Sequence, residues 1–198
     1  MSDILILTEE LYIGRGTNKR VYKHPSDSSL CIKINCYDNN GHGSKELKRE
    51  LRYHCLIGND LKLTEVIARY HGESKTNMGC GYIYDLIKDY DGETSQTLGD
   101  YLLDPLFVVD NFEEIGRELR LLKEELIKHK IVIMGIVPSN ILRQKLSAKI
   151  ARLILVDNLG SGSLIPLEYY IDYFACKRIE RRWKRFEDDI KKNFKILF

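Results

Sequence analysis

The stretch IVIMGIVPSNILRQK, residues 131–145, decides the fold that we expect for this chain. It is apolar and β-branched up to Pro138, and Asn140 follows two residues later. Further along, Asp157 ends the apolar run LILVD and opens the run DNLG. An amide and a carboxylate oxygen are donors that suit a hard cation held together with phosphates. The alternative is structural, with Asn140 capping the turn after Pro138 and Asp157 starting an Asx turn.

The pattern on either side of this stretch changes from β-rich to helical. The sequence predicts strands within residues 4–37, at 66–71 and at 80–87, and helices at 45–57, 98–103, 111–129 and within 167–198. The polar, turn-rich run KDYDGETSQT suits a hinge between the two halves. We therefore predict an α+β, bilobal fold. Residues 1–88 would form an antiparallel sheet with one helix, and residues 89–198 a reduced, mainly helical lobe.

The run IGRGTNKRVYKH, residues 13–24, matches part of the protein-kinase glycine loop, G-x-G-x-x-G-x-V. Gly14, Gly16 and Val21 fit this pattern, whereas Lys19 replaces the third glycine. Glycines allow the backbone to approach phosphate oxygens without an intervening side chain. The alternative is an ordinary hairpin turn. A dinucleotide-binding fold is disfavoured, because a strand rather than a helix follows the loop.

A lysine inside an apolar strand is the next candidate. Lys33 lies in CIKI and is costly to bury unpaired, unless the strand is an edge or the side chain reaches solvent. In kinases the corresponding lysine contacts the nucleotide phosphates and pairs with a helix glutamate. The predicted helix offers Glu46 and Glu50 on one face, and we expect Glu50 to be the partner.

When the opening stretch is aligned with the kinase catalytic loop, H-R-D-L-x-x-x-N, the catalytic aspartate of that loop is missing. Asn140 and Asp157 stand at the metal-binding positions, but Gly135 occupies the position of the catalytic aspartate. Val137 stands where Ser/Thr kinases usually have lysine. Loss of a positioned base costs on the order of 10²- to 10⁴-fold in rate. Only 41 residues follow Asp157, without an Ala-Pro-Glu segment, so the usual peptide-binding platform is missing or shortened.

Over nearly its full length, from about Ile13 to Phe186, the chain resembles the bacterial YrbL family of PhoP regulatory network proteins, in the protein-kinase-like superfamily. The resemblance rests on CIKI, KELKRELRYH, RYHGE, GYIYDLIKDYDG, PSNIL with DNLG, LIPL and RRWKRF. It implies a kinase-like fold and a link to two-component, magnesium-responsive regulation. It carries kinase roles to Gly14, Gly16, Val21, Lys33, Glu50, Asn140 and Asp157, but not to Lys19, Gly135, Val137 or Asn158. The segment 81–87 would lead into the hinge, with Tyr84 behind the adenine and backbone groups of Asp85 to Ile87 facing it.

The amino-acid composition limits the classes of partner that we expect for this chain. The chain has 198 residues, a formal net charge of +2 and 43% hydrophobic residues, which is ordinary for a globular protein and does not favour nucleic acid. Five scattered cysteines without C-x-x-C argue against a disulfide framework or zinc knuckle and for a reducing compartment. No apolar run approaches the roughly 20 residues of a membrane span. We expect a cytoplasmic protein that does not bind membranes.

Four functions fit these observations. The first is an ATP- and Mg²⁺-binding regulatory protein, a pseudokinase or weak atypical kinase with a possible protein partner or substrate. The second and third are an active atypical phosphotransferase and a nucleotidyltransferase on the same frame. The fourth is an interaction module acting through the basic run KRIERRWKRFEDDIKKNFK, residues 177–195. That run also reads as an amphipathic helix whose apolar face, with Trp183 and Phe186, packs on the lobe.

Overall fold

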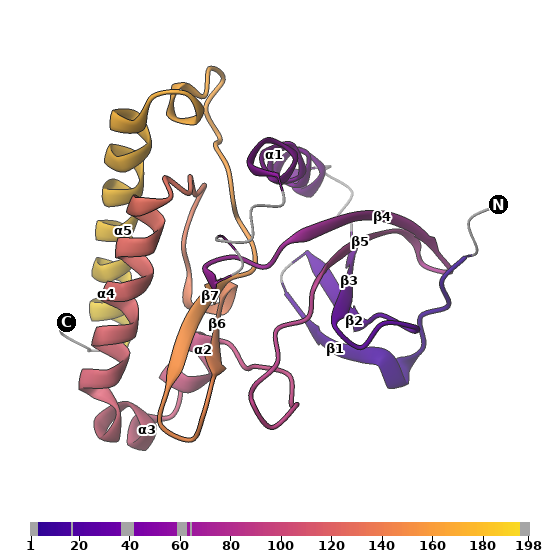
Figure 1. Cartoon of the computed structure of the whole chain (residues 1–198), viewed down its shortest axis with the longest axis horizontal. Helices are drawn as coiled ribbons and strands as arrows, with labels where there is room; N and C mark the ends of the chain where they lie inside the picture. The colour runs from indigo at the N-terminus through magenta and orange to yellow at the C-terminus, as the bar shows by residue number, and fades with distance from the viewer. Residues whose placement is uncertain (1–3, 17, 37–41, 59–62, 64, 195–198) are drawn as a thin grey trace.

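The computed structural model describes residues 4–16, 18–36, 42–58, 63 and 65–194 (Figure 1). Seven strands are present in these residues: β1 (Tyr12–Arg15), β2 (Lys19–Lys23), β3 (Leu30–Asn35), β4 (Tyr70–Thr76), β5 (Gly79–Asp85), β6 (Ile141–Lys145) and β7 (Ala151–Leu155). The α-helices are α1 (His42–Ile57), α2 (Leu98–Leu102), α3 (Pro105–Asp110), α4 (Phe112–Lys128) and α5 (Asp172–Phe194). Short 3₁₀ turns cover Glu9–Leu11, Pro138–Asn140 and Leu167–Tyr169.

The N-terminal half forms a five-stranded antiparallel sheet in the order β1-β2-β3-β5-β4. The central strand β3 is buried along both faces, which explains its continuous apolar sequence. Ile32 and Ile34 pack with Leu7 on one face, while Cys31 packs with Leu47 of α1 on the other. The predicted sheet with one helix is therefore present, and Lys33 points to the face that α1 covers.

The C-terminal half is built from α2 to α5 around the two-stranded sheet of β6 and β7. In Figure 1, α4 and α5 run side by side on the edge farthest from the five-stranded sheet. Trp183, Phe186 and Ile190 of α5 are buried in the main core with Leu122 and Leu126 of α4. The packing interpretation of the basic helix is thus correct for its apolar face. Among the described helices, none is long and apolar enough to cross a membrane.

Two expectations from the sequence need correction. The strand expected at 66–71 is displaced, because β4 begins at Tyr70, and Ile67 instead forms an isolated bridge with Leu155. The helix α3 was not expected at all. Its start is marked by Asp104, whose carboxylate accepts hydrogen bonds from the first turn, and by Pro105 at the first helical position. These two residue types in succession are a helix-start signal that the apolar spacing alone does not provide.

Buried polar contacts fix the segments around residues 131–143. Arg143 of β6 forms two hydrogen bonds of 2.8 Å with the Glu118 carboxylate of α4, and both side chains are buried. The Tyr53 hydroxyl of α1 accepts a 2.8 Å hydrogen bond from the backbone N–H of Val132. Gly160 has a φ of +96°, and a Cβ there would lie 3.0 Å from Tyr53. This close approach docks α1 against the C-terminal half.

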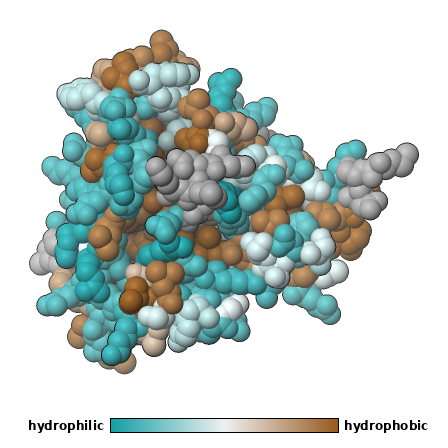
Figure 2. Space-filling model, in the orientation of Figure 1, coloured by the Kyte–Doolittle hydropathy of each residue, from teal (hydrophilic) through white to brown (hydrophobic). Residues whose placement is uncertain are grey.

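The surface of the helical part has one apolar region that lies apart from these segments. Figure 2 shows hydrophobic residues gathered at the top of the molecule, over the connection between β7 and α5. Leu164, Ile165, Tyr170 and Tyr173 are all exposed there.

Candidate functional site

A cavity of about 820 Å³ lies between the five-stranded sheet and the segments that flank the β6–β7 hairpin. Its volume is within the usual range of small-molecule sites. The cavity is lined by all residues that the sequence assigns to nucleotide or metal: Gly14, Gly16, Val21, Lys33, Glu50, Asp85, Ile87, Asn140 and Asp157. These positions are spread over most of the chain, and the fold brings them to one place. Gly135 is not part of the lining.

One end of the cavity is apolar. Val21 reaches it from β2, and Leu142 reaches it from β6. At this end the Asp85 carbonyl oxygen accepts a weak, 3.5 Å contact from the Cys31 thiol. The N–H of Ile87 has no hydrogen-bond partner among the described residues. A flat, apolar group bearing one donor and one acceptor would satisfy both backbone groups.

The glycine-bearing strand approaches the cavity closely. A Cβ added to Gly14 would meet nothing within 4 Å, and one added to Gly16 would meet only the Lys19 carbonyl oxygen, at 3.9 Å. Gly16 is held by a 2.8 Å hydrogen bond from its N–H to the same oxygen. Packing within the described chain therefore does not require glycine at either position, and both glycines line the cavity.

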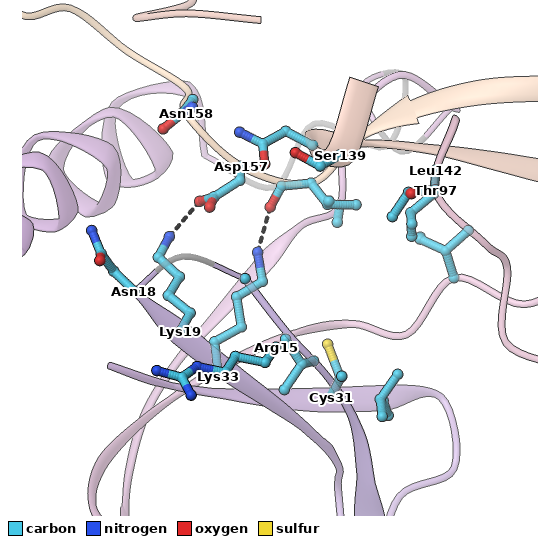
Figure 3. Close-up of a pocket in the computed structure, with 18 of the residues that line it drawn as sticks. Arg15, Asn18, Lys19, Cys31, Lys33, Thr97, Ser139, Leu142, Asp157 and Asn158 are labelled. Atoms are coloured by element: carbon cyan, nitrogen blue, oxygen red, sulfur yellow. Dashed lines mark hydrogen bonds and ion pairs between the residues drawn. The ribbon is translucent and has the colours of Figure 1, made fainter. Parts of the chain in front are cut away.

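The polar end of the cavity contains an arrangement that was not expected. Lys19, given no role from the sequence, extends from the start of β2 to the Asp157 carboxylate and contacts it directly (Figure 3). Its Nζ also lies 3.3 Å from Glu50 Oε2. Only 17% of the Lys19 side chain is exposed, and 2% of Glu50. The sequence offered no signal for this contact beyond the replacement of a glycine by lysine.

The expected ion pair between Lys33 and Glu50 is absent among these described side chains. The Lys33 ammonium donates instead to the Val156 carbonyl oxygen and lies 4.1 Å from the centre of the Tyr84 ring. Lys33 is only 7% exposed, so its charge is desolvated. Glu50 is the partner of Lys19, and its other carboxylate oxygen, Oε1, is buried without a hydrogen bond in the described chain. Glu50 therefore pairs with Lys19, and not with Lys33 as the sequence predicted.

Burial and neighbouring charges shift the pKa values of Lys19, Glu50 and Asp157. Burial lowers the pKa of Lys19, but the Glu50 and Asp157 carboxylates outweigh this effect and raise it above its ordinary value. Burial and the charge of Asp157 raise the pKa of Glu50 to about 7, against the opposing effect of the two lysines. Burial also acts to raise the pKa of Asp157, but Lys33 and Lys19 hold it well below its ordinary value. Asp157 is therefore a carboxylate at neutral pH.

His54, one turn after Glu50 on α1, gives a prediction for stability against pH. Burial, followed by the charges of Lys33 and Lys19, lowers the pKa of His54 from 6.5 to about 4. Between these pH values only the unfolded chain binds the proton, so this contribution to stability rises with pH and is lost as pH falls toward 4. We expect the unfolding free energy of wild type minus that of His54→Gln to rise by roughly 2 to 3 kcal/mol from pH 4 to pH 7.

Urea denaturation of both chains across that pH range measures this difference. The comparison between two chains is needed because the raised pKa of Glu50 gives the opposite slope, stabilising the fold as pH falls. A difference that does not change with pH would contradict the neutral, buried state of His54.

Asn140 and Asp157 meet the chemical requirement for a magnesium ion that also binds phosphates. The two residues are held beside each other, because the N–H of Val156 donates a 3.0 Å hydrogen bond to the Asn140 carbonyl oxygen. Both line the cavity, and a lysine ammonium already stands against the Asp157 carboxylate, which shows that this position accepts a cation. The described residues contain no cluster of three or more His, Cys, Asp or Glu side chains that could hold a metal alone. Phosphate and water oxygens would have to complete the coordination.

The segment around Gly135, residues 133–139, has no acidic side chain. The strand-like segment before Gly135 pairs with the segment after Asp157, through a bridge between Ile133 and Leu159 and a 2.8 Å hydrogen bond from Met134 N–H to the Asn158 carbonyl oxygen. Asn158 has a φ of +64°, which asparagine tolerates better than most residues. Val137 lines the cavity but brings no charge. The local backbone is thus well fixed around a position without a carboxylate.

The chain is similar to known proteins over most of its length. The family model described as "PhoP regulatory network protein YrbL" matches residues 5–191. The chain is 37% identical to YrbL of Escherichia coli (strain K12) over 180 residues, which cover 91% of this chain and 85% of that protein. The same identity and coverage are found for YrbL of Shigella flexneri. The matched region includes both sides of the cleft.

Proposed function

The chain belongs to the family of the PhoP regulatory network protein YrbL, and from this premise we propose that its cleft binds ATP with Mg²⁺ on a protein-kinase-like frame. In this proposal the protein is a regulatory module, a pseudokinase or weak atypical kinase. A protein partner or substrate of the network would recognise the nucleotide-bound form of the protein.

One observation carries the proposal: a desolvated lysine, a buried glutamate and a metal-competent Asp–Asn pair converge at the polar end of a cavity whose other end is apolar. Such a division suits a nucleotide, because the base is flat and largely apolar at its faces while the phosphates are charged. Asp85 and Ile87 would bind the edge of adenine through their carbonyl oxygen and N–H. Val21 and Leu142 would cover its two faces. The sequence resemblance implies the roles of Asp85 and Ile87, whereas the roles of Val21 and Leu142 are proposed from their place in the cavity lining.

Different cleft residues would bind the phosphates, orient the binding lysine and hold the magnesium ion. Lys33, already buried beside the cavity, would donate to phosphate oxygens at little further desolvation cost. Glu50, whose Oε1 has no hydrogen bond among the described residues, would accept a hydrogen bond from that lysine and keep it oriented. Asn140 and Asp157 would hold Mg²⁺, which supplies charge neutralisation at the β- and γ-phosphates when bound. Gly14 and Gly16 would leave room for the phosphates beneath the strand.

Weak transfer follows from what the acceptor side lacks. With Gly135 in place of the base, a hydroxyl acceptor would be neither oriented nor deprotonated. Val137 provides no cation near the transferred group. We therefore propose nucleotide binding as the main property.

Isothermal titration calorimetry of the full chain with the non-hydrolysable analogue AMP-PNP and Mg²⁺ tests the proposal. We expect saturable binding with a 1:1 stoichiometry and a dissociation constant at or below the millimolar range, with competition by ADP. The absence of heat and of thermal stabilisation at several millimolar nucleotide would reject it.

An active phosphotransferase is a second candidate because another carboxylate lines the cavity. Asp100, at the start of α2, uses Oδ2 to accept hydrogen bonds from the backbone N–H and hydroxyl of Thr97, so Oδ1 is left for a substrate proton. Transfer of label from γ-labelled ATP that is lost in Asp100→Asn would favour this candidate. Transfer from α-labelled ATP would favour a nucleotidyltransferase instead.

A further inference from the structure

The position of Lys19 poses a problem for a cleft that binds magnesium. Its ammonium contacts the Asp157 carboxylate and lies 3.3 Å from Glu50, at the place where a cation held by Asp157 would have to enter (Figure 3). Two ammonium groups, of Lys19 and Lys33, face two acidic side chains, of Glu50 and Asp157, so the cluster carries no net negative charge that would attract a further cation. A divalent cation entering this cluster would be repelled by the ammonium it has to displace.

The cluster also has the means to rearrange. Lys33 donates to a neutral carbonyl oxygen, that of Val156, while the buried Glu50 Oε1 nearby has no hydrogen bond in the described chain. If Lys19 leaves, Glu50 can take Lys33 as its partner. Lys19 is the first residue of β2, and a lysine has a long, flexible side chain. We therefore expect that a change of rotamer can move its charge away from the carboxylates, toward the part of the cavity that Gly14 and Gly16 line.

Resting on the proposed function, we infer that Lys19 is a phosphate-binding residue that also keeps divalent cations out of the nucleotide-free cleft. In the empty cleft Lys19 holds the cation position at Asp157. An arriving triphosphate provides an alternative set of anionic oxygens and draws the ammonium away, and Asp157 is then open to metal. Metal binding in this protein is consequently tied to nucleotide binding.

Arg20, the residue next to Lys19 on β2, provides a comparison. Arg20 is fully exposed, and its side chain does not line the cavity. The substitution Arg20→Met therefore removes the same formal charge from the same strand without touching Glu50 or Asp157. It serves as the matched control for Lys19→Met, in which methionine keeps the length and apolar stem of lysine but removes its charge.

The first arm of the test uses Mn²⁺ alone as the probe and electron paramagnetic resonance of the free ion as the readout. We expect the full-length Lys19→Met chain to bind Mn²⁺ at least tenfold more tightly than wild type, and Arg20→Met to behave as wild type. The second arm measures AMP-PNP affinity by calorimetry in EDTA. We expect at least a tenfold loss in Lys19→Met and little change in Arg20→Met.

The outcomes separate this inference from the proposed function. Equal Mn²⁺ affinity in wild type and Lys19→Met would overturn the exclusion of metal by Lys19, whether or not nucleotide binds. Unchanged AMP-PNP affinity in Lys19→Met would overturn its role toward phosphate. If no chain binds AMP-PNP with or without metal, the proposed function fails, and the phosphate role fails with it. Tighter Mn²⁺ binding by Lys19→Met would support the exclusion even then. Circular dichroism and thermal melting of each variant identify a loss of fold.

Discussion

Replacing Lys33 with methionine is expected to weaken ATP binding by roughly 10- to 100-fold, which corresponds to loss of a charge-assisted hydrogen bond to phosphate. Lys33 is 7% exposed and lines the cavity, so its charge is already desolvated at the place where we propose that the phosphates bind. Methionine fills the same volume and leaves no cavity. Calorimetric titration with AMP-PNP and Mg²⁺ measures the change.

The control for this substitution is Lys23→Met on β2. Lys23 is exposed and lies outside the cavity, so its removal changes the net charge equally without altering the cleft. We expect its affinity to match wild type. An unchanged affinity in Lys33→Met, with the thermal melt showing a folded chain, would refute the role of Lys33. Equal losses in both variants would mean that only the overall charge matters.

The largest effect on stability is expected for Trp183→Ala, which should lower the unfolding free energy by roughly 3 to 5 kcal/mol. Trp183 is 2% exposed and packs edge-to-face on Phe186 at a centroid distance of 5.3 Å. Its indole N–H donates a 2.8 Å hydrogen bond to Glu187. Truncation would leave a large cavity in the core between α4 and α5. Urea denaturation followed by circular dichroism measures the loss.

The next residue on the helix provides a matched control. Lys184 is exposed, and Lys184→Ala should change stability by less than about 0.5 kcal/mol. If Trp183→Ala were equally mild, α5 would not be part of the core. Its basic run would then be available as a whole for an interaction partner. If the expected contrast is found, only the exposed charges of the helix remain open to such a partner.

Much of the architecture can be predicted because its elements have strong local patterns. The apolar run around Lys33 became the central strand β3, and the regular leucines of residues 112–128 became α4. Prediction failed where the local pattern was misleading. Residues 66–68 are apolar because they are buried beside β7, not because they form a strand of the larger sheet. The short helix α3 depends on its cap at Asp104, which an apolar periodicity does not detect.

The candidate site was predictable in its membership but not in its pairing. The glycines, Lys33, Asn140 and Asp157 could be selected because each residue type matches a motif position on the expected element. The contact between Lys19 and Asp157 joins residues 138 positions apart, and it depends on how far one flexible side chain reaches across the cleft. Glu50 could be chosen as a buried acid, but which lysine it would meet depended on the tertiary structure.

The two sides of the cleft differ in a way that bears on regulation. Under the proposed function, the residues that would bind a nucleotide all line the cavity, whereas Gly135 and Val137 stand at the positions that the sequence aligns with a base and a cation. A protein that holds a nucleotide without passing on its phosphate can still change its surface with nucleotide and metal supply. We propose that Lys19 links metal binding to nucleotide binding.

A crystal structure of the full chain with AMP-PNP and Mn²⁺ is the most direct test of the central claim, that this cleft binds a nucleotide. We predict the adenine between Val21 and Leu142, bonded to Asp85 O and Ile87 N, and phosphates contacted by Lys19 and Lys33. The anomalous signal of Mn²⁺ should lie between Asn140 and Asp157. An empty cleft in crystals grown at saturating nucleotide, or a nucleotide bound at another surface, would contradict the account.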